Sequence, residues 1–234
     1  MAYGLALGVG QFGLLFSAIK LGMPAGLASL VVQVQGFFTI GLAFVLLGER
    51  LSRFQALGAL VALGGIGLIA GERFEATALV PLLMVLLAAF FWGVSNIASK
   101  EAGRIDMLAF VVWSSLVPIL PLLGLSLLFE GPAAMGEALG GGVSWPILGI
   151  IGFNGYCATL LGFGLWSYLL ARYPAGLIAP LSLLVPVVGM ASAFVLLGET
   201  MTGLEVVGSA LVFAGLVVNV FGPRLWARRR KAIS

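Results

Sequence analysis

One stretch of the chain recurs at a constant offset of 150 residues, and this repeat constrains the fold more than any other feature. The first copy runs from Pro24-Ala-Gly-Leu to Phe44-Val-Leu-Leu-Gly-Glu, and the second runs from Pro174-Ala-Gly-Leu to Phe194-Val-Leu-Leu-Gly-Glu. The copies align without a gap and are identical at 11 of 26 positions. Long internal repeats in apolar chains are typical of membrane transporters built from two related halves. The repeat therefore predicts a two-part membrane protein.

Composition places the chain in a lipid bilayer. Of its 234 residues, 61% are hydrophobic and 9% are charged, whereas soluble domains carry about 25% charged residues. With no histidine and one cysteine, an internal disulfide and a metal site built from these ligands are excluded. The net charge of +3 comes from a basic C-terminal cluster, which suits a membrane surface better than a nucleic acid. We expect the lipid bilayer as a partner, and neither a cofactor nor a nucleic acid.

Eight apolar segments are long enough to cross the bilayer as helices. They span residues 2–19, 24–47, 54–71, 77–99, 107–129, 145–170, 175–197 and 203–222. Backbone groups in lipid must bond one another, and no segment alternates polar and apolar residues, so helices are expected rather than a barrel. Ser52-x-x-Gln and Thr202-x-x-Glu are capping-box patterns, and Pro24 and Pro174 suit the first turn of a helix. The prediction is an all-α membrane protein with eight transmembrane helices.

The basic residues predict the orientation of these helices. Five helices separate equivalent elements of the repeat, and because five is odd the second copy should cross the membrane inverted. With the C-terminus in the cytoplasm, the inner side holds Arg50, Arg53, Lys100, Arg104, Arg172, Arg224, Arg228, Arg229, Arg230 and Lys231. The outer side then holds only Lys20 and Arg73. Ten against two follows the positive-inside rule, so a cytoplasmic C-terminus is expected.

The two halves differ in length. The first, residues 1–72, holds three of the predicted helices, and the second, residues 77–222, holds five before a basic tail at 223–234. Symmetry predicts an N-terminally shortened version of a ten-helix, five-plus-five inverted-repeat design, with two helices absent ahead of residue 1. We expect so short a chain to be inactive in transport, because one wall of its cavity would open to lipid.

Several stretches of the chain resemble a known transporter family. They are Gln11-Phe, Ala18-Ile, the run 22–31, Gln33-x-Gln35, Phe37-Phe-Thr-Ile40, Gly48-Glu-Arg-Leu51, the run 179–189 and Asn219-Val-Phe-Gly222. In these residues the chain is similar to the EamA-type branch of the drug/metabolite transporter superfamily, and most to its exporters of O-acetylserine and cysteine. The resemblance covers essentially the whole chain and departs from the family in the two absent helices. It implies ten helices in two inverted repeats and a plasma-membrane exporter of small amino-acid metabolites.

The predicted substrate site contains no charged residue. All charged residues lie in loops or at helix ends, so no carboxylate that could relay protons lies at membrane depth. A pocket without fixed charge suits a small zwitterion, whose carboxylate and ammonium can be held by dipoles and amides. The candidate substrate-binding residues are Gln11, Gln33, Gln35, Trp92, Asn96, Trp113, Ser114, Asn154, Tyr156, Tyr168 and Ser182.

For several of these residues the sequence leaves a packing role open. Gln33 and Gln35 point about 200° from each other on a helix, so at most one can face a given cavity. Each amide can equally bond a neighbouring helix. Trp92, Asn96 and Ser99 share one helical stripe, which either packs or lines a cavity.

Prolines inside the segments mark candidate helix breaks or gates. Pro180 and Pro186 in the seventh segment, and Pro118 and Pro121 in the fifth, each remove a backbone donor. Broken helix at membrane depth is tolerated where it lines a cavity, although a simple kink is the alternative. The repeat partners of Pro180 and Pro186 are not prolines, so the two copies are expected to break differently.

The leading interpretation is a secondary exporter that works by alternating access in the plasma membrane. The alternative is a shortened, transport-inactive paralogue that serves as a scaffold or partner subunit. An enzyme is not expected, because the chain lacks a deep carboxylate pair, a histidine or a Ser/Lys dyad. The energy coupling, the substrate and the oligomeric state, including a homodimer, stay open.

Overall fold

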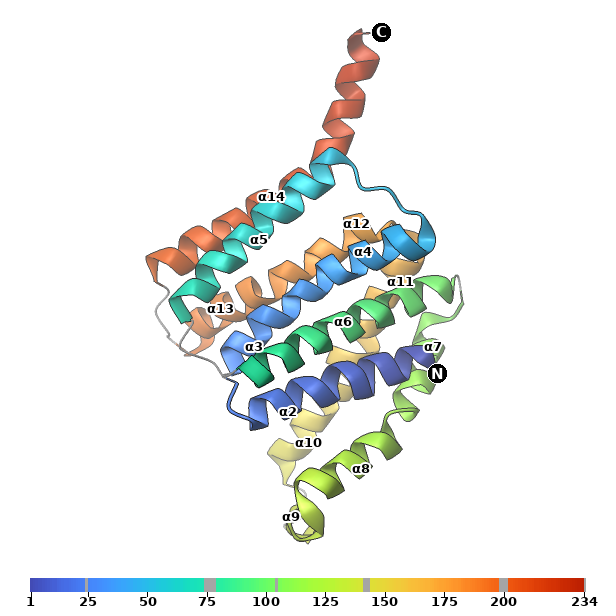
Figure 1. The fold of residues 1–234 in the computed structure, drawn as a ribbon, viewed down its shortest axis with the longest axis vertical. Coiled ribbons are helices and arrows are strands. Elements are labelled where there is room, and N and C mark those ends of the chain that lie inside the picture. Colours follow the sequence, from blue (N-terminus) through green and yellow to red (C-terminus); the bar gives the residue numbers. More distant parts are fainter. Residues whose placement is uncertain (24, 74–78, 104, 141–143, 198–201, 234) are drawn as a thin grey trace.

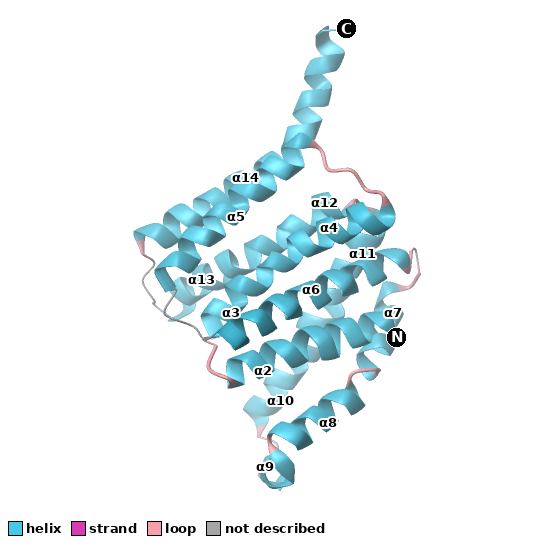
Figure 2. Ribbon diagram, in the orientation of Figure 1, coloured by secondary structure: helices cyan, strands magenta, loops and turns pink. Residues whose placement is uncertain are grey.

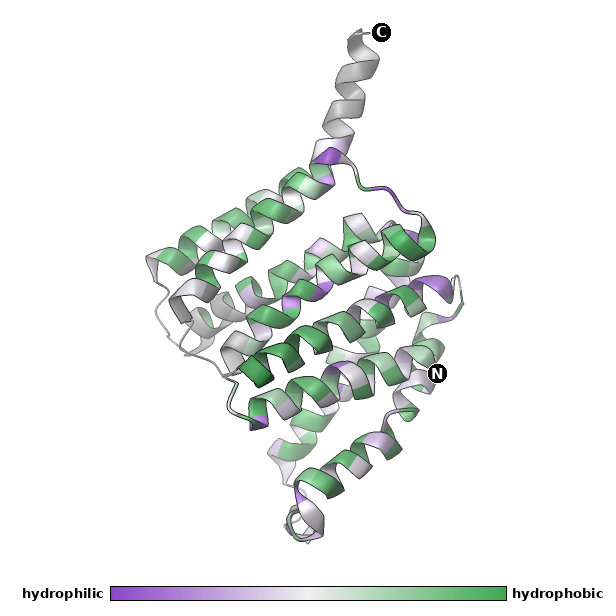
Figure 3. Ribbon diagram, viewed as in Figure 1, coloured by the Kyte–Doolittle hydropathy of each residue, from purple (hydrophilic) through white to green (hydrophobic). Residues whose placement is uncertain are grey.

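The computed structural model describes residues 1–23, 25–73, 79–103, 105–140, 144–197 and 202–233, and all regular structure within these ranges is helical (Figure 1, Figure 2). Six helices are long and apolar enough to span a membrane, namely Ala2–Lys20, Ala28–Leu47, Leu79–Glu101, Met107–Phe129, Trp145–Arg172 and Val206–Pro223. Two further helices, Arg53–Ile69 and Ala175–Gly189, are apolar but shorter. The all-α membrane class is therefore confirmed, while the number of eight spans stays a prediction. Figure 3 shows the apolar residues spread along these helices.

The two copies of the repeat fold into the same succession of elements. The first contains α1 (Ala2–Gly4), π-helical η1 (Leu5–Gly13), α2 (Leu14–Lys20), α3 (Ala25–Val31), 3-10 helix η2 (Val32–Val34), α4 (Gln35–Leu47) and α5 (Arg53–Arg73). The second contains α10 (Trp145–Gly152), π-helical η3 (Phe153–Phe163), α11 (Gly164–Arg172), α12 (Ala175–Ile178), 3-10 helix η4 (Ala179–Leu183), α13 (Leu184–Leu197) and α14 (Gly203–Ile233). The irregular segments thus recur at matching places in both copies.

This match corrects the prediction that the copies break their helices differently. The 3-10 segment of the second copy contains Pro180, but the 3-10 segment of the first copy contains no proline. Proline is therefore not required for a 3-10 segment at this place in the repeat. Pro186 lies in the first turn of α13, directly after η4.

Between the copies lie α6 (Leu79–Glu101), α7 (Met107–Leu116), α8 (Ile119–Phe129) and α9 (Gly131–Gly140). The break between α7 and α8 falls at Val117 and Pro118, and the amide of Val117 donates to the carbonyl of Ser114 at 3.2 Å. Pro118 thus lies at the junction of α7 and α8, whereas Pro121 lies within the first turn of α8. Whether this junction acts as a helix break or gate or is a simple kink stays a prediction. The long connection after α8 forms a helix, α9.

The N-terminal helix packs on the break in the fifth segment. A Cβ atom on Gly4 would lie 2.2 Å from the carbonyl oxygen of Ser114, and one on Gly8 would lie 2.3 Å from the Pro118 ring. Only glycine permits this approach of backbone to backbone.

Helices α5 and α14 lie side by side at one edge of the molecule and run antiparallel (Figure 1). Gly58 of α5 meets Gly215 of α14, and Gly65 of α5 meets Gly208 of α14. A Cβ atom added to any of these glycines would lie only 2.4 to 2.7 Å from the carbonyl oxygen of the facing glycine. Gly58 and Gly208 are repeat partners, as are Gly65 and Gly215. Each copy thus offers the same two glycines to the other in crossed order, as a two-fold interface requires.

The helix ends test the capping predictions. The amide of Ser52 donates to Gln55 Oε1 at 2.9 Å, and the amide of Gln55 donates to Ser52 Oγ at 3.2 Å, so the first capping box is confirmed. Pro174 does not lie in the first turn as predicted but at the N-cap of α12, because its ψ of 139° is extended. Pro24 and the Glu205 side chain lie outside the described residues. The predicted tail at 223–234 continues α14 as far as Ile233, past Pro223.

Candidate functional site

Four side chains from three helices form a buried hydrogen-bonded group, which we call the amide cluster: Gln35, Thr39, Asn96 and Trp166. Asn96 Nδ2 donates to Gln35 Oε1 and to Thr39 Oγ1, each at 2.9 Å. Asn96 Oδ1 accepts from Trp166 Nε1 at 2.9 Å, while Thr39 donates to the carbonyl oxygen of Gln35 at 2.8 Å. Asn96 therefore joins α4 of the first copy to α11 of the second.

Local structure explains why these residues meet. Gln35 opens α4 directly after the 3-10 turn, and Thr39 follows one helical turn later on the same face. Asn96 and Ser99 lie one turn apart on α6, and Ser99 Oγ lies 3.1 Å from Ser167 Oγ of α11. The predicted stripe on α6 therefore faces the second copy as well as the first.

Four buried polar atoms of the first copy and α6 have no hydrogen-bond partner among the described residues. They are the donors Gln35 Nε2 and Trp92 Nε1 and the acceptors Gln11 Oε1 and Gln33 Oε1. Gln11, Gln33 and Gln35 are 1%, 2% and 0% exposed. A polar atom without a partner is costly to bury, and such atoms concentrate at functional sites. All four lie on helices of the first copy or on α6.

The remaining candidate residues lie elsewhere. Ser114 is buried at the fifth-segment break, and Ser182 donates to the carbonyl of Ala179 at 2.8 Å. Trp113 and Tyr156 are each 71% exposed, and Asn154 is exposed and donates to its own helix at Ile150. The structure thus brings Gln35 and Asn96 together and leaves these residues outside the amide cluster.

Two members of the amide cluster were not among the predicted site residues. Thr39 follows Gln35 by four residues, so the helical period placed it on the right face, but threonine usually bonds its own helix. Trp166 lies near the end of its apolar segment, where a tryptophan is more often an interfacial anchor. Its bond to Asn96 depends on tertiary packing and leaves no local signal.

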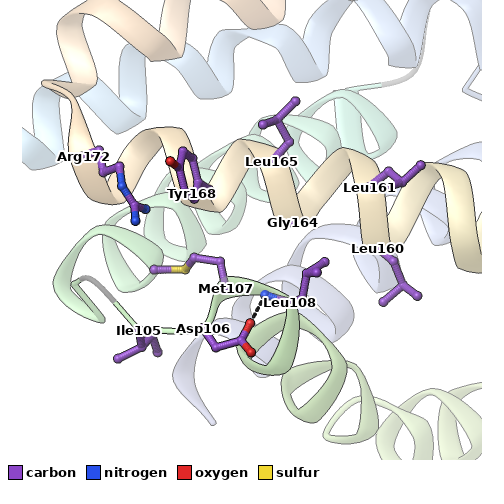
Figure 4. A pocket seen from close by; sticks show the side chains of 10 residues that line it. All are labelled: Ile105, Asp106, Met107, Leu108, Leu160, Leu161, Gly164, Leu165, Tyr168 and Arg172. Carbon is purple, nitrogen blue, oxygen red and sulfur yellow. Dashed lines mark hydrogen bonds between the residues drawn. The ribbon is translucent and has the colours of Figure 1, made fainter.

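A hollow of about 410 Å³ opens between the start of α7 and the face of η3 and α11 (Figure 4). The lining residues are Ile105, Asp106, Met107, Leu108, Leu160, Leu161, Gly164, Leu165, Tyr168 and Arg172. The guanidinium carbon of Arg172 lies 3.6 Å from the centre of the Tyr168 ring, and Asp106 caps α7 by accepting from the amide of Leu108 at 3.0 Å. Tyr168 is 42% exposed and is the predicted substrate residue that lines this hollow.

A second hollow, of about 550 Å³, lies between α2 and α8 beside Lys20 and Glu130. Neither hollow is lined by a member of the amide cluster. Within the described residues, no group of three or more His, Cys, Asp or Glu side chains could hold a metal ion.

Comparison with known proteins supports a transporter. The family model "EamA-like transporter family" matches residues 79–221. A probable amino-acid metabolite efflux pump of Salmonella typhimurium is 45% identical over 240 residues, covering all of this chain and 79% of the relative. A protein of the same description from Escherichia coli is 42% identical, covering all of this chain and 78% of the relative.

More distant relatives agree with this result. A probable terminal-alkyne amino-acid exporter of Streptantibioticus cattleyicolor is 31% identical over 97% of this chain and 74% of its own length. A crystal structure that is 24% identical superposes with a TM-score of 0.76 over 94% of this chain and 76% of that chain, which shows the same fold. Since the family model matches more than half of the chain and two relatives align along all of it, the chain belongs to the EamA-like transporter family.

Proposed function

We propose that this protein is a secondary transporter that exports small amino-acid metabolites such as O-acetylserine or cysteine. The observation that carries the proposal is the similarity, along the whole chain, to two probable amino-acid metabolite efflux pumps. The names of these relatives describe transporters and not enzymes.

Four unpaired polar atoms on the first copy and α6 are of the kinds that a zwitterion needs. Gln35 Nε2 and Trp92 Nε1 are donors that suit a carboxylate, and Gln11 Oε1 is an acceptor that suits an ammonium group. Gln33 Oε1 is a second acceptor, on the opposite side of the helix from Gln35. Amides can hold both charged groups without introducing a fixed charge at membrane depth, where ionised side chains are costly. The substrate would then receive two kinds of hydrogen bond from the first copy and α6.

We further propose that the two copies are inverted repeats that move against each other in alternating access. The matching order of irregular elements and the crossed glycine contacts of α5 with α14 support this arrangement. A two-fold axis that exchanges two antiparallel membrane helices lies in the membrane plane, and that is the symmetry of an inverted repeat.

The proposed orientation places the C-terminus in the cytoplasm, on the basis of the ten-to-two distribution of Lys and Arg. A reporter that is active only in the cytoplasm should be active when fused after Ser234. Activity of a periplasm-specific reporter at the same position would overturn this orientation.

Export can be tested with a variant that removes one of the unpaired amide oxygens. Gln33→Leu removes an amide whose Oε1 has no partner, so membrane abundance should stay unchanged while export falls by about tenfold. Asn154→Leu is the matched control, because Asn154 is exposed and bonds only its own helix. Because the 234-residue chain by itself is expected to be inactive, the variants are made in a version extended at the N-terminus to the ten-helix design. Export is measured as extracellular O-acetylserine or cysteine after overexpression.

Two results would count against the proposal. Normal export by Gln33→Leu would make this amide a packing residue and move the substrate site elsewhere. A ten-helix version of the chain that reaches the membrane in normal amounts but exports nothing would favour the alternative of a transport-inactive scaffold or partner subunit.

A further inference from the structure

An ion pair outside the amide cluster joins three segments at one end of the molecule. Lys100 Nζ, in the last turn of α6, lies 2.8 Å from Glu49 Oε1, which follows α4. The two side chains are only 15% and 24% exposed. By contrast, Lys20 and Glu130 at the opposite end are 3.9 Å apart and about half exposed.

Both partners of this ion pair also bond the turn between α11 and α12. Lys100 Nζ donates to the carbonyl oxygens of Leu170 at 3.1 Å and Tyr173 at 2.6 Å. Glu49 Oε2 accepts from the backbone amide of Ala175 at 2.8 Å. The pair therefore fastens the end of α4, in the first copy, to the α11–α12 turn of the second copy, with α6 between them.

The hollow beside this pair is small. A hollow of only about 10 Å³ lies behind Glu49, with a lining that includes Ile40, Gln55 and Gly176. A space of that size holds about one water molecule and cannot pass a metabolite. In the proposed orientation this end faces the cytoplasm, the side from which an exported substrate must enter.

Separating Lys100 from Glu49 is unfavourable because both charges are partly buried. A part-buried charge that loses its partner keeps the cost of desolvation and gains nothing in return. An amino acid carries the same two charges, on an ammonium and a carboxylate group bonded to one carbon. Its carboxylate can therefore pair with Lys100 in place of Glu49, while its ammonium pairs with Glu49 in place of Lys100. Both protein charges then stay paired while the two segments separate.

We propose that Lys100 and Glu49 form a latch that holds the cytoplasmic end closed and that a zwitterionic substrate opens by exchanging partners with the two charges. This inference rests on the proposed export function and adds to it an entry site and a reason for zwitterion selectivity. A ligand can shift such an equilibrium only through its preference for the open state, and the exchange supplies that preference.

The latch can be tested by chemical labelling, without measuring transport. Ile40→Cys, made in a Cys157→Ser background, places a reporter in the small hollow, and inside-out vesicles are treated with a membrane-impermeant maleimide. In the otherwise unchanged protein we expect slow labelling of this cysteine. L-serine should accelerate the labelling, and it is used in place of L-cysteine because it is an isosteric zwitterion without a thiol. Serine methyl ester and N-acetylserine, which each carry one charge, should have no effect.

Charge variants complete the test. Lys100→Met should raise the labelling rate by about tenfold or more, since Glu49 is left without its counter-charge. Adding Glu49→Gln to Lys100→Met should give no further increase, because both changes remove the same interaction. The double variant should also lose the response to serine, whereas Lys20→Gln at the opposite end is the matched control and should label like the parent.

Two outcomes would overturn the latch: unchanged labelling in Lys100→Met, or equal acceleration by serine and its single-charge analogues. A failure of the proposed export function would be recognised separately, in the export assay. A chain that exports nothing but shows the expected labelling keeps the latch, whereas a chain that exports without any labelling response refutes it.

Discussion

In the first copy of the repeat, Gln35 and Thr39 of α4 are both 0% exposed and face α6. Their partners at the same register of the second copy are Val185, which is 56% exposed, and Gly189, which is also exposed. The same contrast holds for the π-helices, where Gln11 is 1% exposed and its partner Leu161 is 66% exposed. The two copies therefore share their elements but not the burial of this face.

The difference follows from the position of α6. This helix covers η1, α2 and α4 of the first copy, where Gly10 allows close approach of the Phe91 ring. In the second copy the matching position is Leu160, which is half-buried, and its helix η3 packs on α7, α10 and α11. An apolar face needs no protein cover in lipid, whereas an amide does. The buried amides of this fold therefore lie where another helix can provide a hydrogen-bond partner.

The largest expected effect is at the contact between α5 and α14, where both copies contribute the same two glycines. Gly58→Leu and its repeat partner Gly208→Leu should each destabilise the protein by at least about 3 kcal/mol, since the new side chain meets backbone or packed atoms of the facing helix. Unfolding in mixed detergent micelles measures the loss. Gly64→Leu is the control, because an added Cβ at Gly64 meets nothing within 4 Å. Very different losses of stability for Gly58→Leu and Gly208→Leu would contradict the two-fold symmetry of this contact.

The next effect separates a polar residue in the amide cluster from an exposed one. Asn96→Leu removes three hydrogen bonds, at a cost of about 2 kcal/mol. It leaves Trp166 Nε1 without a partner, and Gln35 Oε1 keeps only the Thr39 hydroxyl at 3.3 Å. Asn154→Leu, compared in the same micelle assay, should change stability by less than about 0.5 kcal/mol. An equal loss for both asparagines would mean that burial by α6 is not what distinguishes the copies.

Exchanging the residues at one register between the two copies tests what surrounds the exposed face of α13. If the exposed Val185 faces hydrocarbon, Val185→Gln should destabilise the protein in a bilayer by about 1 kcal/mol, because its amide would find no partner there. The measurement is the unfolding free energy in lipid bicelles, with Gln35→Val as the reciprocal variant. If Val185→Gln costs nothing, water rather than lipid reaches this face of α13.

The smallest effect compares the two capping boxes. Ser52→Ala should cost about 1 kcal/mol by removing the acceptor of the Gln55 amide. Thr202→Ala should cost about the same if the predicted second box forms, as judged by thermal unfolding of the two variants. A loss at Ser52 alone would restrict the capping signal to the first copy.

The helical class and the element boundaries were predictable because they depend on local chemistry. Apolar length, the capping pattern at Ser52 and the break at Pro118 act within a few residues, so they can be read without knowing the fold. The match between η2 and η4 was missed, because η2 contains no proline or glycine that would signal a break. The substrate candidates were predicted only in part, since periodicity places a residue on a face but does not say what covers that face.

By itself, the sequence determined that this chain lies in a membrane as helices, that it contains two related copies, and that no charged group lies at membrane depth. These properties depend on composition and on spacing along one helix. Only the tertiary structure decided that Asn96 unites Gln35 with Trp166, and that Lys100 is held by Glu49 and the α11–α12 turn. Such contacts join residues distant in sequence, and their partners depend on how whole helices pack, which no local pattern encodes.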